Sequence, residues 1–161
     1  MPATLSGGRL AEALRISDRE GLARYVALQP HHNLVHRHDY EGALRQVCLQ
    51  ERLSCLPYFA LANGFLTGKY RQGSTVDSVR ASDATRHLDA RGRRVLATLE
   101  EVANARRTTI AAVALAWLLA DSTIAAPIAS ARTPAQLSDL MPAAELPLGP
   151  EDMSRLTDAS A

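Results

Sequence analysis

Three short apolar runs, separated by segments with helical spacing, constrain the fold of this chain more than any other feature. The runs are Tyr25 to Gln29, Ser54 to Phe59 and Thr123 to Ile128, and we interpret each as a short buried strand. Strands that alternate with helices are usually joined by crossover connections. The pattern therefore predicts an α/β fold with a parallel sheet and helices outside it.

Apolar residues recur at helical spacing between and after these runs. Ser6 can cap the first helix and Gly21 suits its end, while Ile110 to Ala120 is apolar nearly all round, which is typical of a buried helix. From Gln72 to about Thr85 no hydrophobic period is found, and we expect a long loop. The expected helices are Arg9 to Gly21, Asp39 to Arg52, one from near Arg86, Ile110 to Ala120, one from Thr133, and Glu151 to Leu156.

Length limits how much of a larger architecture this chain can form. A complete eight-stranded α/β barrel needs at least about 200 residues, and this chain has 161. With 47% hydrophobic and 22% charged residues we expect one globular domain over residues 1–161. The net charge of +1 gives no case for nucleic-acid or membrane-surface binding. Because no signal segment or membrane span is found, we expect a cytoplasmic protein with Cys48 and Cys55 as packed, reduced thiols.

The run that begins near Cys55 passes into a Gly-punctuated loop that carries Lys69. This is the only Lys in the chain, and the other 17 basic residues are Arg. A compact cation at the end of a strand is typical of a ligand site, although a solvated loop Lys gives the same pattern.

The same stretch resembles the aldo-keto reductase family, whose seventh barrel strand typically ends in Tyr-Ser-Pro-Leu-Ala followed by Gly-x-Leu-Thr-Gly-Lys-Tyr. Two further matches are Gln29-Pro30-His31-His32-Asn33-Leu34, against Gln-x-x-Tyr-Asn-Leu, and the segment from Pro127 to Leu137. The resemblance covers about the C-terminal half of the family's fold. It implies a partial (β/α)8 TIM-type barrel of about three parallel strands. The matching residues are Tyr58-Phe59-Ala60-Leu61-Ala62 and Gly64-Phe65-Leu66-Thr67-Gly68-Lys69-Tyr70.

The resemblance also implies an NADP (NADPH) site at the carboxyl ends of the strands. Gln29 would hydrogen-bond the nicotinamide carboxamide and Tyr58 would stack on the nicotinamide ring. Lys69 and Arg80 would supply cations to the pyrophosphate. The segment beside the pyrophosphate would be Phe59, Ala60, Leu61, Ala62 and Asn63.

At the adenine end, the third run leads into a helix N-terminus at Thr133, which favours an anion. Ser130 and Arg132 are therefore candidates for the 2′-phosphate of NADP. By resemblance, Gln136 and Asp139 would read the adenine. Gln136 has an equally good explanation as part of a helix capping box, and Leu140, where the family has Asn, would weaken the adenine contacts.

We expect no catalytic residue in this chain, because the family's catalytic Asp, Tyr, Lys and His belong to the missing N-terminal half. Lys69 cannot replace that Lys, since it belongs to the seventh-strand loop. The family's Ser-Asn would align near Ala3-Thr4 and is absent, and Phe59 and Ala60 stand where the family has Ser and Pro. The first interpretation is an oxidoreductase of a carbonyl substrate that needs its other half. The alternative is a non-catalytic binding or scaffold protein.

Four histidines, His31, His32, His36 and His38, could form a zinc or nickel site completed by Asp39 or Glu41. Their spacing matches no established zinc motif, and a polar loop explains them as well, so we expect no metal here. Three parallel strands would also leave two open edges and an uncovered apolar inner face. We therefore expect a homo-oligomer, or a complex with a chain that supplies the missing strands.

Overall fold

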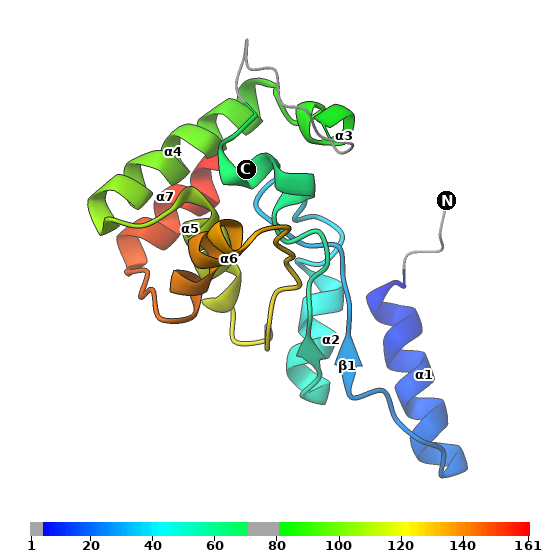
Figure 1. The fold of residues 1–161 in the computed structure, drawn as a ribbon. Helices are drawn as coiled ribbons and strands as arrows, with labels where there is room; N and C mark the ends of the chain where they lie inside the picture. Colours follow the sequence, from blue (N-terminus) through cyan, green and yellow to red (C-terminus); the bar gives the residue numbers. More distant parts are fainter. Residues whose placement is uncertain (1–4, 71–80) are drawn as a thin grey trace.

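The computed structural model describes residues 5–70 and 81–161, and within them two short parallel strands form one sheet (Figure 1). Strand β1 is Ala27–Leu28 and strand β2 is Ser54–Cys55, with Ala27 opposite Ser54 and Leu28 opposite Cys55. The chain is therefore a mixed α/β fold with parallel pairing, as the alternation of apolar runs predicts.

The third apolar run joins this sheet through a single bridge, in which Ile124 pairs in parallel with Cys55. The Cys55 amide donates to the Thr123 carbonyl at 2.8 Å, and the Ala125 amide donates to the Cys55 carbonyl at 2.9 Å. The three runs pair in parallel, as expected, but their lengths as regular strands are shorter than expected. Each run contains or is followed by a proline (Pro30, Pro57 or Pro127), which has no N–H to continue the ladder.

The burial expected for the first run is wrong at its start. Tyr25 and Val26 are 59% and 76% exposed, and Ala27 is also exposed. In the described part of the chain, β1 pairs only with β2 and is an edge strand. The apolar character of residues 25–27 therefore does not reflect burial within this chain.

Side-chain caps fix the starts of several helices. Ser6 accepts from the Arg9 amide, Asp89 from the Gly92 amide and Thr109 from the Ala112 amide. The helices are α1 (Gly7–Glu20), α2 (Ala43–Glu51), α3 (Ala81–Thr85), α4 (Ala90–Arg106), α5 (Ile110–Leu119), α6 (Pro134–Leu140) and α7 (Pro150–Ala159), with 3₁₀ helices η1 (Ala62–Thr67) and η2 (Met141–Ala144).

Several of the expected boundaries need correction, and helix α7, for example, runs to Ala159 rather than ending at Leu156. Helix α2 begins at Ala43 rather than Asp39, because residues 38–42 form turns that end at Gly42 with φ 104°. Helix α4 begins only after its cap at Asp89. The expected loop from Gln72 to Thr85 contains helix α3 at its end, and residues 71–80 lie outside the described part of the chain.

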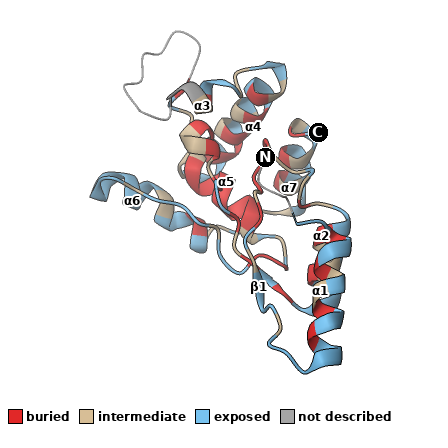
Figure 2. Ribbon diagram, turned by 90° about the vertical axis from the view of Figure 1, so that its right-hand side faces the viewer, coloured by how far each residue is buried: buried red, intermediate tan, exposed pale blue. Residues whose placement is uncertain are grey.

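Helix α5 forms the centre of the hydrophobic core, and eight of its ten residues are buried. It packs against α4, α6, η1 and η2, whereas α1 packs against α2. Figure 2 shows α5 buried among the other helices and α6 exposed along its length. The uniformly apolar sequence of α5 predicts this buried position.

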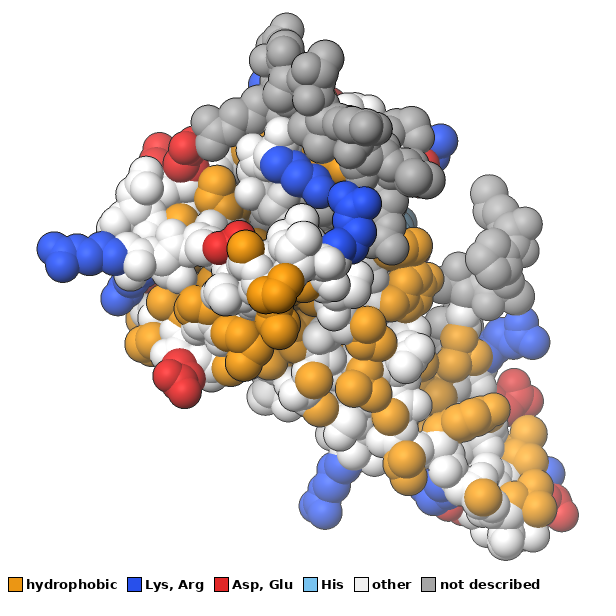
Figure 3. Space-filling model, viewed as in Figure 1, with side chains coloured by type: hydrophobic (Ala, Val, Ile, Leu, Met, Phe, Trp, Pro, Cys, Tyr) orange, Lys and Arg blue, Asp and Glu red, His pale blue; other side chains and the backbone are white. Residues whose placement is uncertain are grey.

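One face of the molecule carries many exposed apolar side chains, which Figure 3 shows gathered across the side on which the strands lie. They come from segments far apart in the sequence. Within residues 5–70 and 81–161, no helix is long and apolar enough to cross a membrane. Large apolar side chains that are exposed among the described residues include Tyr25, Val26, Tyr58, Phe59, Ile128, Leu137 and Met141, and we refer to these seven residues together as the open apolar face.

The contact between α1 and α2 gives a test of this packing. A Cβ added at Gly7 would lie 2.8 Å from both the carbonyl carbon and oxygen of Ala43, whereas a Cβ at Gly8 would have no neighbour within 4 Å. We expect Gly7→Ala to lower the free energy of unfolding by about 1–3 kcal/mol through overpacking. Gly8→Ala should leave it unchanged or raise it by up to about 1 kcal/mol. Urea denaturation of both variants measures this, and equal effects would contradict the close approach of the two helices.

Candidate functional site

A groove of about 820 Å³ lies where the loop after β2 meets the segment after Ile124. Its lining comes from the loop, from the N-terminal part of α5 and from α6. The structure thus brings together most of the predicted cofactor residues from two distant parts of the sequence. They are Tyr58, Phe59, Ala60, Leu61, Asn63 and Lys69 from one wall and Ser130, Arg132, Gln136 and Asp139 from the other.

The loop wall is held in an unusual backbone conformation. Phe59, Ala62 and Asn63 have φ values of 53°, 48° and 57°, in the left-handed region that non-glycine residues rarely adopt. Asn33 stabilises this conformation: its side-chain amide donates to the Phe59 carbonyl at 2.9 Å, and its Oδ1 accepts from the Val35 amide at 2.9 Å. Because Asn33 is fully buried, the loop is fixed before any ligand binds.

Aromatic rings lie at one end of the groove. The rings of Tyr58 and Phe59 are 5.1 Å apart, and each lies 5.3 Å from the ring of His31. The Tyr58 ring is stacked against His31 at an interplanar angle of 27°, so one of its faces is already covered. Burial, with the neighbouring His36, lowers the pKa of His31 to about 4, so this imidazole is neutral at physiological pH.

Lys69 folds back over the glycine-rich turn of the same loop. Its Nζ lies 5.0 Å from the centroid of the Tyr70 ring, and a Cβ added at Gly64 would lie 3.2 Å from its Cε. The absence of a side chain at Gly64 therefore makes room for the lysine stem at the groove.

The opposite wall is built around the start of α6. Thr133 caps this helix by accepting from the Gln136 amide, and the Gln136 Oε1 accepts from the Arg132 amide at 2.9 Å. The capping role of Gln136 is therefore present, and its adenine role stays a prediction. The Thr109 hydroxyl donates to the Asp139 carbonyl at 2.5 Å, which ties α6 to the start of α5.

Three of the predicted residues are not part of this groove's lining. Gln29 is exposed beyond β1, and Ala62 is buried beneath the loop. Arg80 lies outside the described residues. Sequence reasoning had assigned no cofactor role to Thr67, Thr109, Ala111 or Ala129, which line the groove. Thr109 is the cap of α5, and its distance in sequence from both walls gives no sign that it also lines the groove.

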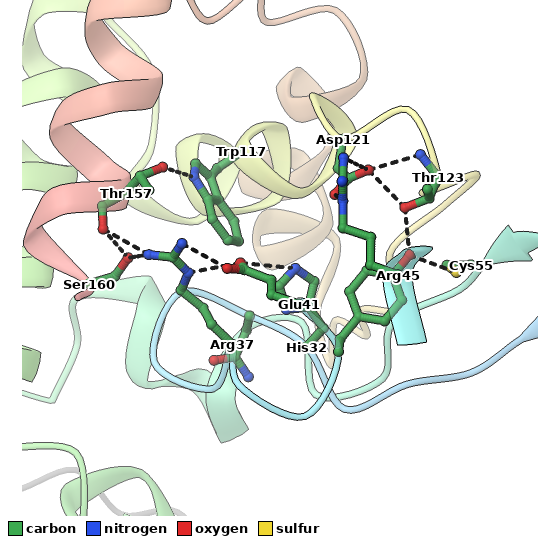
Figure 4. A network of polar contacts seen from close by, with 12 residues as sticks. His32, Arg37, Glu41, Arg45, Cys55, Trp117, Asp121, Thr123, Thr157 and Ser160 are labelled. Atoms are coloured by element: carbon green, nitrogen blue, oxygen red, sulfur yellow. Dashed lines mark hydrogen bonds and ion pairs between the residues drawn. The ribbon is translucent and has the colours of Figure 1, made fainter. Parts of the chain in front are cut away.

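A second cavity, of about 520 Å³, lies between the loop after β1, α5 and α7. Figure 4 shows its polar network. Arg37 donates twice to Glu41, once to the Thr157 carbonyl and once to Ser160 Oγ, each at 2.8 Å. These bonds attach the C-terminal helix to the loop that carries the histidines.

His32 lies in the same network and is 2% exposed. Its Nε2 is 4.0 Å from Glu41, and its Nδ1 finds no hydrogen-bond partner among the described residues. Burial lowers the pKa of His32, and the carboxylate of Glu41 opposes this effect. A neutral histidine thus occupies the position where the resemblance places a tyrosine.

The comparison with protein families gives the same assignment over nearly the whole chain. The sequence model of the Aldo/keto reductase family matches residues 5–161. The chain belongs to this family. Members of the family typically use NAD(P)H.

Curated relatives are distant and much longer. A probable voltage-gated potassium channel subunit beta of Arabidopsis thaliana is 26% identical over 147 residues, covering 88% of this chain and 45% of the relative. A putative aryl-alcohol dehydrogenase of Schizosaccharomyces pombe is 26% identical over 149 residues, covering 91% and 42%. The L-glyceraldehyde 3-phosphate reductase of Escherichia coli K12 is 30% identical over 118 residues, covering 69% and 34%. The chain spans less than half the length of these relatives.

Proposed function

We propose that this chain is the cofactor-binding, C-terminal half of an NADP-dependent aldo-keto reductase barrel, which reduces a carbonyl substrate only when the other half is present. The groove carries the proposal, because it gathers ten residues that the family motifs assign to the cofactor. Its volume is also within the range of about 300–1,000 Å³ that is usual for ligand sites.

Each wall of the groove has a separate role in this proposal. The free face of Tyr58 would stack on the nicotinamide, and the fixed loop with Lys69 would hold the pyrophosphate. Arg132 would pair with the 2′-phosphate that distinguishes NADP from NAD. NADPH, when bound, supplies the hydride for carbonyl reduction. The described residues of this chain position it and provide no assigned proton donor.

Cofactor preference tests the groove directly. We expect the chain to bind NADPH more tightly than NADH, and Arg132→Ala to remove that preference. Losing a charge-assisted contact costs about 1.5–3 kcal/mol, which corresponds to about a 10- to 100-fold loss of NADPH affinity. Quenching of Trp117 fluorescence or calorimetric titration measures both affinities.

The matched control for this test is Arg94→Ala, because Arg94 is exposed on α4 and lies outside the groove. It should leave both affinities unchanged. Equal binding of NADPH and NADH by the parent chain, or no selective loss in Arg132→Ala, would count against the 2′-phosphate role.

A non-catalytic binding or scaffold role is the second candidate. One observation favours it: a relative with similar coverage bears the name of a potassium channel subunit rather than of an enzyme. Under this alternative the open apolar face would serve a protein partner and the groove would have lost its dinucleotide. Absence of any NADPH binding by the folded chain would favour this role over the reductase.

Carbonyl reduction by the chain alone is a separate question. We expect no turnover of an aromatic aldehyde with NADPH, because the proton donor of the family lies in the half that this chain does not span. The measurement is NADPH oxidation followed by absorbance across the final purification step. Activity that follows the protein peak and persists after repeated purification would show that this expectation is wrong.

We also propose that a second polypeptide covers the open apolar face, and that it carries the missing barrel strands. Tyr25 and Val26 on the edge strand would otherwise remain exposed to water, and the face also includes Tyr58, Phe59 and Ile128, which line the groove. Without that polypeptide, a second copy of this chain would be the available substitute.

Light scattering on the purified chain tests the need for such a cover. We expect dimers or larger species, and less self-association when Val26, which is 76% exposed, is changed to Lys. The control is Leu49→Lys, at an exposed position of α2. Val47 on α2 is unsuitable because it packs against the core. A species that stays at 17.4 kDa at high concentration and binds no hydrophobic dye would contradict this proposal.

A further inference from the structure

The loop after β1 brings two imidazoles and one carboxylate together. The Nε2 of His36 lies 2.7 Å from Oδ2 of Asp39, and the Nε2 of His38 lies 2.8 Å from Oδ1 of the same residue. The potential ligand atoms of these three residues all lie within 4.8 Å of one another. Spacing in the sequence gave no reason to select these three from the histidine run, and the convergence is visible only in the structure.

From this convergence we infer that His36, His38 and Asp39 form a binding site for a divalent transition-metal ion, with Zn²⁺ as the expected occupant. Two imidazoles and a carboxylate are a ligand set that suits zinc, with bonds of about 2.0–2.2 Å. Ligands on one tetrahedral ion lie about 3.4 Å apart at such bond lengths. The three residues therefore need only small movements to enclose an ion, and a fourth position stays open for water.

The residues next to each ligand are anchored, so the site is preorganised. Val35 is buried and its carbonyl accepts from Arg91 at 2.9 Å. Arg37 is held by Glu41 and by the C-terminal helix, and Tyr40 is fully buried. The side chains that alternate with the ligands are thus fixed to the core, and the ligands face away from it.

The orientation of His36 is also set by its surroundings. Its amide and carbonyl both pair with Asn33, at 3.0 and 3.1 Å. Its ring stacks on His31 with centroids 3.7 Å apart and planes 10° apart. Stacking of this kind restricts rotation of the ring, as outer-shell contacts do for ligands in metal sites.

A merely polar loop would show the same hydrogen bonds without binding metal, and this is the alternative to be excluded. In the metal-free chain the Asp39 carboxylate accepts a hydrogen bond from His36 and lies 2.8 Å from the Nε2 of His38. In the metal-bound chain each imidazole would carry its proton on Nδ1 and offer the Nε2 lone pair, so the ion would replace these two contacts with three ligand bonds. The inference does not depend on the cofactor groove or on the proposed function.

Calorimetric titration of the full, untagged chain with ZnCl₂ tests the site, after metal has been removed with a chelator. We expect one ion per chain. Loss of an outer-shell partner alone costs about 10- to 100-fold in affinity, so His36→Ala, His38→Ala and Asp39→Asn should each cost at least about 100-fold. Co²⁺ absorption should change in the same variants, because it reports directly on the ligands.

Two controls separate the site from incidental binding. His87→Ala removes a histidine outside the cluster, and Asp139→Asn removes a carboxylate in the groove, so both should keep the parent affinity. His38 has a side chain that is 78% exposed, so His38→Ala keeps the test decisive even if another variant fails to fold. No Zn²⁺ binding up to millimolar concentration, or binding that persists in His38→Ala and Asp39→Asn, would overturn the inference.

Discussion

Hydrogen bonding around Cys55 holds the three parallel segments together, and the loops that carry the groove and the histidine cluster follow these segments. Cys55 pairs with β1 on one side, and its amide and carbonyl bond to the segment at Thr123 to Ala125 on the other. The Tyr40 hydroxyl lies 3.0 Å from the Cys55 sulfur and 2.5 Å from Thr123 Oγ1. Burial raises the pKa of Tyr40, so its phenol stays protonated and keeps a proton to donate to Cys55 or Thr123.

The same network continues to an ion pair between Arg45 and Asp121. Thr123 donates from both its amide and its hydroxyl to Asp121, which also accepts from Arg45 at 2.6 Å. Burial would raise the pKa of Asp121, but the bonds from Arg45 and Thr123 outweigh it and keep the pKa below its usual range. A short sheet with little regular pairing is thus supported by side chains, which substitute for the missing ladder.

Sequence reasoning succeeded where a signal is local and failed where it depends on a distant partner. The caps at Ser6 and Thr133 and the buried helix α5 follow from residues within a few positions of one another. The exposure of Val26 could not be foreseen, because an apolar run does not reveal whether the strand beside it is present. The groove was found through motif resemblance, whereas the participation of Thr109 and the convergence on Asp39 needed three-dimensional packing.

The groove and the cluster of His36, His38 and Asp39 lie at positions where ligand binding would not require a complete barrel. Both regions lie in loops after the strands, and both are anchored from within the chain: Asn33 fixes the loop at Phe59, and Arg37 fixes the histidine loop to α7. Both anchors donate to backbone carbonyls of this chain, at Phe59 and Thr157, and need no second polypeptide. A ligand that binds only the folded chain would stabilise it by mass action, as would a polypeptide that covers the apolar face. Because Tyr58, Phe59 and Ile128 belong to both the groove and the open apolar face, a ligand in the groove and a covering polypeptide would meet at these residues, and their stabilising effects are not expected to add independently.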